Sequence, residues 1–318
     1  MKAACIDKFG QVDTVEFKEQ AVPNPKANEL LLRVAYAGVN PVDWKICEGQ
    51  LKEMMPHEFP ITLGWDMSGV VTEIGKNVQG FTVGDEVYAY CRKESVHDGS
   101  FSEYICLDAS HVAPKPSSLS FAQAACIPLT GLTAWQSLFD FCGLQKGQNI
   151  LIHAGAGGVG SLAIQFAKHA GAFVITTARK KNHDYVTKLG ADWVIDYSEE
   201  DFDKAIKERF PTGLELVFDC AGGETLIRSY PLVKENGCLV SIVEPPNESL
   251  LPSKTIKSGF VFVSPNSQQL KEIGALFDSG VLILPEIQEL LFSQVKEALE
   301  ESRKGHVRGK IALKISEV

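Results

Sequence analysis

The sequence predicts an α/β protein in two parts: a β-rich N-terminal part, and a doubly wound parallel sheet flanked by helices. Three observations lead to this prediction. The chain has 318 residues, which favours two domains, since one domain usually has ~100–200 residues. Up to about Pro116, short apolar runs alternate with Gly, Pro and Asn. From Asn149 onward, strand-like runs alternate with helical patterns, which is typical of βαβ units.

The N-terminal part is expected to contain little helix. Turn-forming residues separate its clearest apolar runs, which are Leu30–Val39, Met67–Ile74 and Asp85–Tyr90. A helical pattern follows over Phe121–Phe141. Pro128 lacks the N–H that a helix interior needs, and Gly131 is a weak helix former. We therefore expect this helix to break or kink.

Strands and helices alternate regularly in the second part. The predicted strands are Asn149–Ala154, Ala172–Thr177, Trp193–Asp196, Leu214–Cys220 and Gly237–Val243. The predicted helices between them are Val159–Ala170, Lys181–Leu189, Glu200–Phe210 and Glu224–Val233. Helices of about ten residues between strands predict a parallel sheet with right-handed crossovers.

The remaining chain follows a Pro-rich break at Glu244–Asn247. A strand at Phe260–Val263 is predicted to extend the sheet, and helices are predicted at Gln268–Asp278 and Phe292–Ser302. The final strand, Lys310–Ile315, has no partner in this sheet. We therefore expect it to return to the N-terminal part, which makes that part discontinuous.

Composition narrows the class of protein. Hydrophobic residues make up 45% of the chain, and the formal net charge is -9. An acidic surface disfavours nucleic acid or an anionic membrane as the main partner. The N-terminus lacks the apolar core of a signal peptide, and no apolar run approaches the ~20 residues of a membrane span. These features predict a cytoplasmic protein, whose eight scattered cysteines are expected to be free thiols.

A glycine-rich hexapeptide, Gly155–Gly160, directly follows the first strand of the second part and opens a helix. It fits the G-x-G-x-x-G pattern, in which glycines let the backbone turn tightly and approach a pyrophosphate closely. The N–H groups and dipole of the helix N-terminus then hold the anion. Since no Lys-Ser/Thr follows the glycines, a P-loop is excluded. The context predicts a Rossmann dinucleotide site, with Gly155, Gly157, Gly158, Val159 and Gly160 at the phosphates.

The end of the next strand predicts which dinucleotide binds. NAD sites usually place Asp or Glu about 20 residues on, to accept from the ribose 2′-OH. No acidic residue occurs here between Gly160 and Asp184, and Arg179–Lys181 is basic. Such a stretch suits a 2′-phosphate and predicts NADPH. The alternative, that these cations simply solvate a helix start, is disfavoured because cations oppose the helix dipole there.

The chain resembles the medium-chain dehydrogenases/reductases, in particular their quinone oxidoreductase and enone (alkenal) reductase branch. The resemblance runs end to end, through the glycine-rich loop and the blocks Ala37–Lys45, Leu63–Val71, Ile127–Trp135, Leu189–Asp192 and Arg308–Lys310. It implies a GroES-like domain formed by residues 1–125 and 265–318, and a Rossmann NADP(H)-binding domain formed by residues 126–264. It also implies an enzyme that reduces quinones or the C=C bond of α,β-unsaturated carbonyls with NADPH, and a homodimer.

The sequence departs from the family's zinc alcohol dehydrogenases at their metal ligands. Asn40 stands at the Cys position, and Trp65-Asp66 replaces the His-Glu pair. Cys126 falls near the third position, but one thiol cannot hold Zn²⁺, which takes four ligands. We therefore expect a zinc-free enzyme. Without a Lewis acid to stabilise an alkoxide, acceptors that delocalise charge by conjugation are favoured over simple alcohols.

The resemblance also implies roles for individual residues. Asn40 and Thr130 are expected near the nicotinamide. Thr177, Arg179, Asn182 and Tyr197 are expected around the 2′-phosphate. The rest of the cofactor groove is expected to be lined by Cys220, Ala221, Val243 and Phe262, with Lys310 close by.

The catalytic candidates are Asn40, Asp43 and Lys45, with Lys45 as polariser of the substrate oxygen or proton relay. For Asn40 and Asp43 an alternative stays open. Asn40 followed by Pro41 is a helix N-cap pattern, and Asp43 at the third helical position favours the helix N-terminus.

Two other functions stay open at this stage. The chain could be a non-catalytic NADPH-binding sensor or a structural protein of the crystallin kind, since either would keep the cofactor motifs. A zinc alcohol dehydrogenase is disfavoured by Asn40 and Trp65. The sequence does not identify the physiological electron acceptor, the one- or two-electron character of the reduction, or the proton donor.

Overall fold

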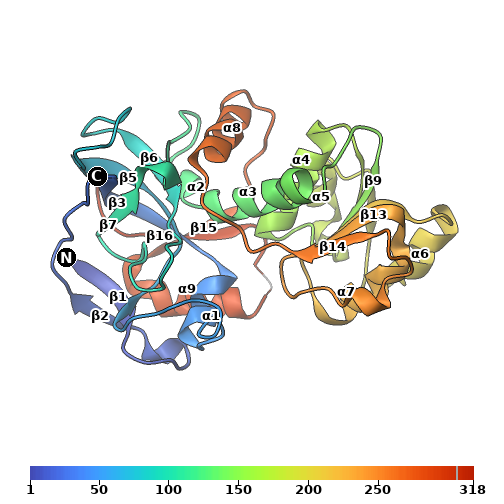
Figure 1. Cartoon of the computed structure of the whole chain (residues 1–318), viewed down its shortest axis with the longest axis horizontal. Helices are drawn as coiled ribbons and strands as arrows, with labels where there is room; N and C mark the ends of the chain where they lie inside the picture. The colour runs from blue at the N-terminus through green and yellow to red at the C-terminus, as the bar shows by residue number, and fades with distance from the viewer. Residues whose placement is uncertain (306) are drawn as a thin grey trace. The chain divides into compact units, whose positions relative to one another are not determined.

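The computed structural model describes residues 1–305 and 307–318. The chain folds into two compact units (Figure 1). Unit 1 comprises Met1–Leu132, Ser264–Gly280 and Glu286–Val318, and unit 2 comprises Thr133–Val263 and Val281–Pro285. No helix in the described part of the chain combines the length and apolar character that a bilayer crossing requires.

Unit 1 is built on a seven-stranded sheet, which runs β15-β16-β3-β5-β6-β8, while β7 pairs with β3 outside this path. Its strands are β3 (Glu29–Val39), β5 (Asp66–Ile74), β6 (Glu86–Tyr90), β7 (Tyr104–Asp108), β8 (Val112–Pro114), β15 (Ile287–Leu291) and β16 (Lys310–Lys314). A second sheet has the order β2-β1-β4, with β1 (Lys2–Ile6), β2 (Glu16–Glu19) and β4 (Ile61–Thr62). The final strand β16 pairs antiparallel with β3, so the predicted return of the chain is confirmed.

The helices of unit 1 are few, as predicted. They are α1 (Pro41–Cys47), α2 (Phe121–Ala124), α8 (Ser267–Asp278) and α9 (Val295–Arg303), and α3 (Pro128–Trp135) begins in this unit. The predicted break in Phe121–Phe141 is confirmed: α2 ends at Ala124, and Pro128 starts a new helix. Pro128 fits there because the first turn of a helix needs no N–H donor. A π-helical turn, Gln136–Phe141, ends the segment.

Unit 2 is a six-stranded parallel sheet in the order β11-β10-β9-β12-β13-β14. Its strands are β9 (Asn149–Ile152), β10 (Phe173–Thr177), β11 (Trp193–Ile195), β12 (Leu214–Asp219), β13 (Val233–Ser241) and β14 (Lys257–Phe260). Its helices are α4 (Gly158–His169), α5 (His183–Lys188), α6 (Phe202–Arg209) and α7 (Gly223–Ser229). The chain leaves β9 first toward β11 and then returns toward β14, so strand order reverses between β9 and β12. Parallel sheets of this kind bind ligands at such a reversal, beyond the carboxyl ends of the strands.

The core of unit 2 explains its apolar strand runs. Leu151, Ile175, Val217 and Leu239 come from four neighbouring strands and are buried in one cluster. Strands covered on both faces read as continuous apolar runs, because neither face is left to solvent. The α/β fold class is therefore as the sequence predicts.

Short 3₁₀ turns connect several elements, at Val12–Thr14, Ala109–His111, Lys180–Asn182, Tyr230–Leu232, Glu248–Leu250 and Phe292–Gln294. All eight cysteines are free thiols, as expected for a chain without a disulfide framework.

Two strand positions differ from the prediction. β14 occupies Lys257–Phe260 rather than Phe260–Val263, because the backbone of Lys257 and Ser258 pairs with Cys238 and Leu239 of β13. β15 at Ile287–Leu291 has no counterpart in the prediction. Its side chains are exposed or half-buried, so it lacks the apolar pattern from which strands are recognised.

Candidate functional site

The predicted cofactor residues of unit 2 lie at one edge of its sheet. Each follows or ends a different parallel strand: the glycine turn after β9, Thr177 on β10, Tyr197 after β11, Cys220 and Ala221 after β12, Val243 after β13, and Phe262 after β14. Because the strands are parallel, all these carboxyl ends meet at the same edge. The geometry therefore brings the residues to the place where an open α/β sheet binds a dinucleotide.

Different structural constraints explain why individual positions of the turn are glycine. A Cβ on Gly155 would lie 2.1 Å from Thr176 Oγ1, and a Cβ on Gly160 would lie 2.4 Å from the carbonyl oxygen of Ala154. Both glycines are thus required by the packing of the protein itself. Gly157, at the N-cap of α4, has φ -79°, and the nearest atom to its Cβ position is 3.3 Å away. Its missing Cβ leaves space beside the helix N-terminus, which is what close approach of a pyrophosphate requires.

The residue before the turn, His153, is fully buried. Its Nδ1 lies 3.1 Å from Thr177 Oγ1, and its Nε2 lies 2.9 Å from Ser229 Oγ. Thr177 Oγ1 also accepts from the N–H of Ala154 at 3.3 Å. Thr177, predicted to face the cofactor, is therefore also bonded within the protein.

The basic residues after β10 are exposed, as expected for a phosphate site. Arg179 Nε donates to Tyr197 OH at 3.0 Å, and Lys180 and Lys181 are open to solvent. The sequence prediction did not anticipate the carboxylate that the fold brings here, Asp196 from the end of β11. It accepts from Lys180 N at 2.7 Å and from the hydroxyl and amide of Ser198. The Ser198 hydrogen bonds hold the pKa of Asp196 below its ordinary value.

The loops after β12 and β13 are organised by Asp219. This buried carboxylate accepts from the amides of Ala221 and Gly222, and from Ser241 Oγ at 2.7 Å. The backbone around Cys220 and Ala221 is thereby fixed at the sheet edge. Burial raises the pKa of the Cys220 thiol, which favours its neutral form.

In unit 1, the predicted residues Asn40 and Lys310 meet in a buried network with Asp66. Lys310 Nζ donates to Asn40 Oδ1 at 2.5 Å and to the carbonyl oxygen of Val39 at 2.7 Å. Asn40 Nδ2 donates to Asp66 Oδ2 at 2.9 Å. All three side chains are at most 4% exposed. The strand pairing explains the meeting: β3 lies between β5, which starts at Asp66, and β16, which starts at Lys310.

Asp43 and Asp66 complete the network as two buried carboxyl groups. Asp43 Oδ2 accepts from Asn40 N, and Asp66 Oδ1 accepts from Leu129 N, both at 2.8 Å. Burial raises the pKa of Asp43 to about 7, although the Asn40 amide and the Lys310 ammonium favour its ionised form. Burial also raises the pKa of Asp66 to about 6, against Lys310 and Asn40. One cation thus faces two carboxyl groups, and the raised pKa makes Asp43 easier to protonate than an exposed carboxyl group.

The capping pattern is present at the start of α1. Asp43 accepts the N-cap amide, as predicted. Asn40 occupies the N-cap position, and its side chain also bonds Lys310 and Asp66. The N-cap position of Asn40 therefore does not account for all of its side-chain contacts.

Lys45 and Thr130 lie outside the network. Lys45 is half-buried on α1, its Nζ is 5.7 Å from the ring centre of Trp44, and it makes no ion pair within the described residues. Burial lowers the pKa of Lys45. The buried Thr130 hydroxyl bonds the carbonyl oxygens of Cys126 and Ile127. Lys45 thus keeps its donors available, whereas the Thr130 hydroxyl is bonded to the backbone just before its own helix, α3.

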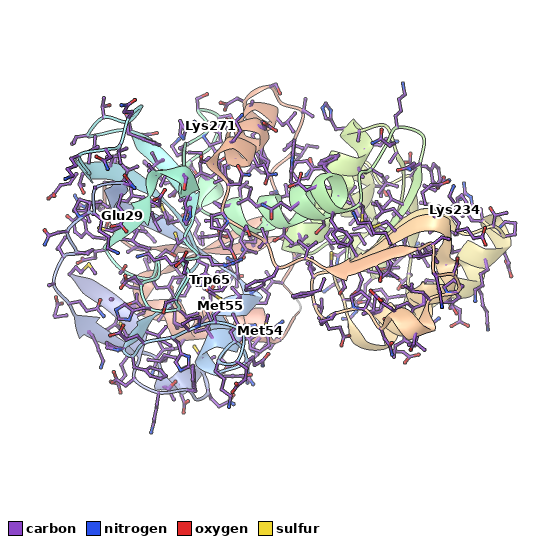
Figure 2. All side chains as sticks on the ribbon, in the orientation of Figure 1. Glu29, Met54, Met55, Trp65, Lys234 and Lys271 are labelled. Carbon is purple, nitrogen blue, oxygen red and sulfur yellow. The ribbon has the colours of Figure 1, made fainter. Side chains whose placement is uncertain are left out.

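The residues at the family's metal positions do not offer a zinc-binding set. Both polar atoms of Asn40 are engaged, and Lys310 places an ammonium beside them. Trp65, labelled in Figure 2, is 4% exposed and meets the ring of Tyr90 edge-on at 6.0 Å. Burial raises the pKa of the Cys126 thiol to about 12. Within residues 1–305 and 307–318, no group of three or more His, Cys, Asp or Glu could hold a metal ion.

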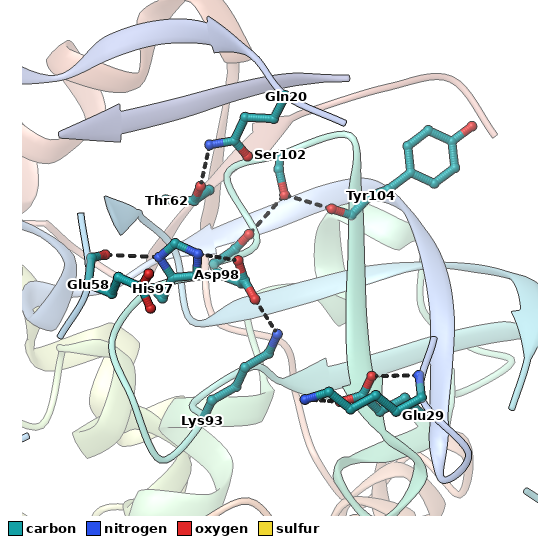
Figure 3. A network of polar contacts seen from close by, with 11 residues as sticks. Gln20, Glu29, Glu58, Thr62, Lys93, His97, Asp98, Ser102 and Tyr104 are labelled. Atoms are coloured by element: carbon teal, nitrogen blue, oxygen red, sulfur yellow. Dashed lines mark hydrogen bonds and ion pairs between the residues drawn. The ribbon is translucent and has the colours of Figure 1, made fainter. Parts of the chain in front are cut away.

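Another polar network of unit 1 lies at the surface and is shown in Figure 3. Lys93 Nζ pairs with Asp98 Oδ2 at 3.0 Å, while His97 contacts Asp98 and the carbonyl oxygen of Glu58. Its members are largely solvent-exposed, so the contacts are screened and contribute little energy. We assign this network to the surface and not to the site.

Two site residues were missed by sequence reasoning although signals existed. Asp66 was noted only as a lost metal ligand, yet an acidic residue at the start of an apolar strand predicts a buried partner. His153 interrupts the apolar run Asn149–Ala154, which marks a polar group that must be satisfied in the core. Their partners, Asn40 and Leu129 for Asp66 and Thr177 and Ser229 for His153, are distant in sequence and become apparent only in the fold.

Comparison with known proteins agrees with this architecture. Residues 26–117 match the family described as alcohol dehydrogenase GroES-like domain, and residues 158–270 match zinc-binding dehydrogenase. The 2-methylene-furan-3-one reductase of Solanum lycopersicum is 34% identical, over 98% of this chain and 79% of its own. The chloroplastic NADPH-dependent alkenal/one oxidoreductase of Arabidopsis thaliana is 33% identical, with the same coverages, 98% and 79%.

Among solved structures, the quinone oxidoreductase from Coxiella burnetii has a TM-score of 0.89, 36% identity and 99% coverage of both chains. Fold and sheet-edge site together define a GroES-like and Rossmann oxidoreductase. The chain belongs to the medium-chain dehydrogenase/reductase family, in its quinone oxidoreductase and enone reductase branch. It is an NAD(P)H-dependent oxidoreductase.

Proposed function

We propose that this enzyme uses NADPH to reduce quinones or the C=C bond of α,β-unsaturated carbonyls, by hydride transfer and without zinc. The observation that carries the proposal is the Lys310–Asn40–Asp66 network. Asn40 stands where the family's zinc enzymes have a ligand, and both of its polar atoms already have partners within the protein. A buried ammonium at this place repels a divalent cation, so no metal-assisted step is assigned.

The preference for NADPH is supported by charge at the sheet edge. Arg179, Lys180 and Lys181 are exposed cations after β10, and guanidinium and ammonium groups bind phosphate well. Asp196 opposes them, but its oxygens accept from backbone amides and Ser198. The chloroplastic relative is named as NADPH-dependent, which agrees with this preference.

The space beside Gly157 suits a pyrophosphate, and residues of this chain would hold and orient the cofactor. Bound there, reduced nicotinamide dinucleotide supplies the hydride. Gly157, Gly158 and Val159 would present backbone N–H groups to the pyrophosphate. Lys45 would polarise the substrate oxygen or donate a proton, since its ammonium is half-buried beside the ring of Trp44 and its pKa is lowered by burial. Asn40 and Asp43 would act through the buried network.

The proposed class of electron acceptor follows from a reaction in which no metal ion acts as a Lewis acid. A simple carbonyl would develop a full alkoxide charge, whereas a quinone or an enone spreads that charge by conjugation. The names of the relatives, an alkenal/one oxidoreductase and a quinone oxidoreductase, support the same class. We further propose a homodimer, and predict the cytoplasm as its compartment, although the Arabidopsis relative is named as chloroplastic.

A cofactor titration and an acceptor panel test this function. We expect NADPH to bind at least about tenfold more tightly than NADH, and Arg179→Ala to remove most of that difference, since one phosphate contact contributes ~1–2 kcal/mol. We also expect NADPH oxidation with members of a panel of quinones, enones and alkenals. Equal wild-type affinity for the two cofactors would refute the phosphate site. Tight NADPH binding without oxidation by any acceptor would favour the non-catalytic alternative.

A further inference from the structure

The hydrogen bonds of His153 define its proton positions. Ser229 Oγ donates to the carbonyl oxygen of Thr225 at 2.7 Å, so toward His153 it acts as acceptor of Nε2–H at 2.9 Å. The ring is then neutral with its proton on Nε2, and Nδ1 accepts the hydroxyl proton of Thr177 at 3.1 Å. Burial, together with the positive charge of Arg228, lowers the pKa of His153 to about 3, so the ring stays neutral throughout ordinary assay conditions.

This arrangement reaches the glycine turn through Thr177. With its proton given to His153, the Thr177 oxygen accepts from the N–H of Ala154 at 3.3 Å. Ala154 has φ +55°, a left-handed conformation that side chains other than Gly rarely adopt. A residue in such a conformation persists when its surroundings hold it there.

Ala154 in turn shapes the turn on both sides. Its carbonyl oxygen accepts from Gly157 N at 3.0 Å, and the same oxygen is the atom that a Cβ on Gly160 would meet. The backbone conformation of Ala154 therefore links the N–H bonded by Thr177 to the carbonyl oxygen that positions Gly157 N and limits the space at Gly160. Gly157 is the glycine whose open side was assigned above to the pyrophosphate.

We propose that His153 is a positioning residue for cofactor binding, acting through Thr177 on Ala154 to hold the glycine turn in its binding conformation. The inference rests on the proposed dinucleotide function. It also gives Thr177 an indirect role, because its proton is donated to His153 and an oxygen lone pair is used by Ala154 N.

The test compares two substitutions of His153. His153→Phe keeps the ring volume and its edge contact with Phe202, whose ring centre is 4.9 Å away, but removes both hydrogen bonds. His153→Asn keeps an acceptor, since Asn Oδ1 can occupy nearly the place of His Nδ1. Ser68→Ala serves as matched control, because it removes a buried hydroxyl that bonds Phe121 O in unit 1. For each protein we would measure the NADPH Kd by cofactor fluorescence, KM and kcat, and the urea midpoint without cofactor.

We expect His153→Phe to raise Kd and KM for NADPH about tenfold, with kcat at saturation within about twofold of wild type. His153→Asn should restore Kd to within about threefold of wild type, and Ser68→Ala should lower the urea midpoint without moving Kd. A lower urea midpoint with unchanged Kd in His153→Phe would make the residue merely structural and overturn the proposal. Equal losses of NADPH affinity in His153→Phe and His153→Asn would also contradict the proposal, because keeping the acceptor for Thr177 would then not rescue binding.

A second variant covers the case in which His153→Phe does not fold. Thr177→Val removes the intermediate hydroxyl while keeping a β-branched side chain, and it should raise the NADPH Kd by a similar factor. If both variants fold, the double variant should be no weaker than either single one, since they break the same chain of bonds. Additive losses would contradict the proposal. Wild-type protein that fails to bind NADPH would instead refute the proposed function, so the two failures are distinguishable.

Discussion

Single residues give this site its chemical character, and the network around Asn40 is the clearest case. The sequence predicts Asn40, Asp43 and Lys310 as site residues, because they fall in blocks that resemble one family. It does not predict that Lys310 is buried and bonded to Asn40. That contact joins residues 270 positions apart, and only the pairing of β16 with β3 brings them together. Local pattern cannot supply such a contact, since periodicity reports faces of elements and not their neighbours.

Lys45 provides the most direct test at this scale. We expect Lys45→Met to lower kcat with an enone acceptor by ~10²-fold or more, the usual contribution of a positioned proton donor. The NADPH Kd, measured separately, should stay within about twofold of wild type. Lys52→Met, which removes an exposed lysine from the following turn, is the control and should behave as wild type. Unchanged turnover in Lys45→Met would eliminate the proposed role.

The buried carboxyl of Asp43 predicts a pH effect on stability. Its folded pKa, about 7, is above the ordinary value of 3.8 for this carboxyl group, so the folded state binds this proton more tightly than the unfolded chain. The contribution of Asp43 to the free energy of unfolding is therefore highest below about pH 4 and declines as pH rises toward 7. Asp43→Asn cannot ionise, so its stability relative to wild type should increase between pH 5 and 8.

Urea unfolding of the apoenzyme at several pH values measures this difference. Asp13→Asn, a substitution of an exposed carboxylate on the same unit, serves as control and should run parallel to wild type. A wild-type to Asp43→Asn difference that stays constant from pH 5 to 8 would show that Asp43 ionises normally.

At the scale of elements, turn chemistry and apolar runs account for most of what the sequence predicts. The break before Pro128 follows from its missing N–H, and the parallel strands of unit 2 follow from their apolar runs. β14 is displaced because its pairing is backbone-to-backbone and its residues are exposed or half-buried. β15 lacks a regular apolar alternation, since it is an edge strand that pairs with β16 on one side only and its side chains are exposed or half-buried. These two edge strands are therefore hard to predict from apolar patterns, because their side chains are not buried.

The glycine turn offers a paired test of element and function. Gly160→Ala places a Cβ 2.4 Å from a backbone oxygen, and we expect a loss of ~1–3 kcal/mol in the free energy of unfolding. Gly157→Ala brings its Cβ to 3.3 Å from the Ala154 carbonyl oxygen, a tight contact that a small shift relieves, so the loss of stability should be at most about 1 kcal/mol. Its NADPH Kd should nevertheless rise at least about tenfold, because the methyl fills the space assigned to the pyrophosphate. Urea unfolding and cofactor titration on both variants separate the two effects. Wild-type affinity in Gly157→Ala would place the pyrophosphate elsewhere.

For the whole molecule, the division into two units is predicted from the chain length and from the alternation of strand-like and helical patterns that begins near Asn149. The observed units begin and end at slightly different residues from the predicted 1–125, 126–264 and 265–318. One difference has a plain cause: Val281–Pro285 belongs to unit 2, where Gln165 of α4 bonds both the N–H and the carbonyl oxygen of Ile283. A five-residue segment that is bonded to unit 2 through one glutamine cannot be recognised from the amino-acid composition.

The proposed homodimer is also a property of the whole molecule. β14 pairs with β13 on one side, and no strand covers its other side within the described residues. An uncovered edge strand is a template for pairing with a second copy. Light scattering on the purified protein should give a mass about twice 34.7 kDa. A monomeric mass at micromolar concentration would contradict the dimer.

The central claim is direct hydride transfer from NADPH to a conjugated acceptor without a metal. It is tested by supplying NADPH deuterated at the transferable C4 position, together with an enone, to enzyme treated with a strong zinc chelator. We predict undiminished turnover and a reduced product that carries deuterium at the β-carbon, because the hydride moves between carbons and never exchanges with water. A product without deuterium, or turnover that returns only when Zn²⁺ is added back, would contradict the account.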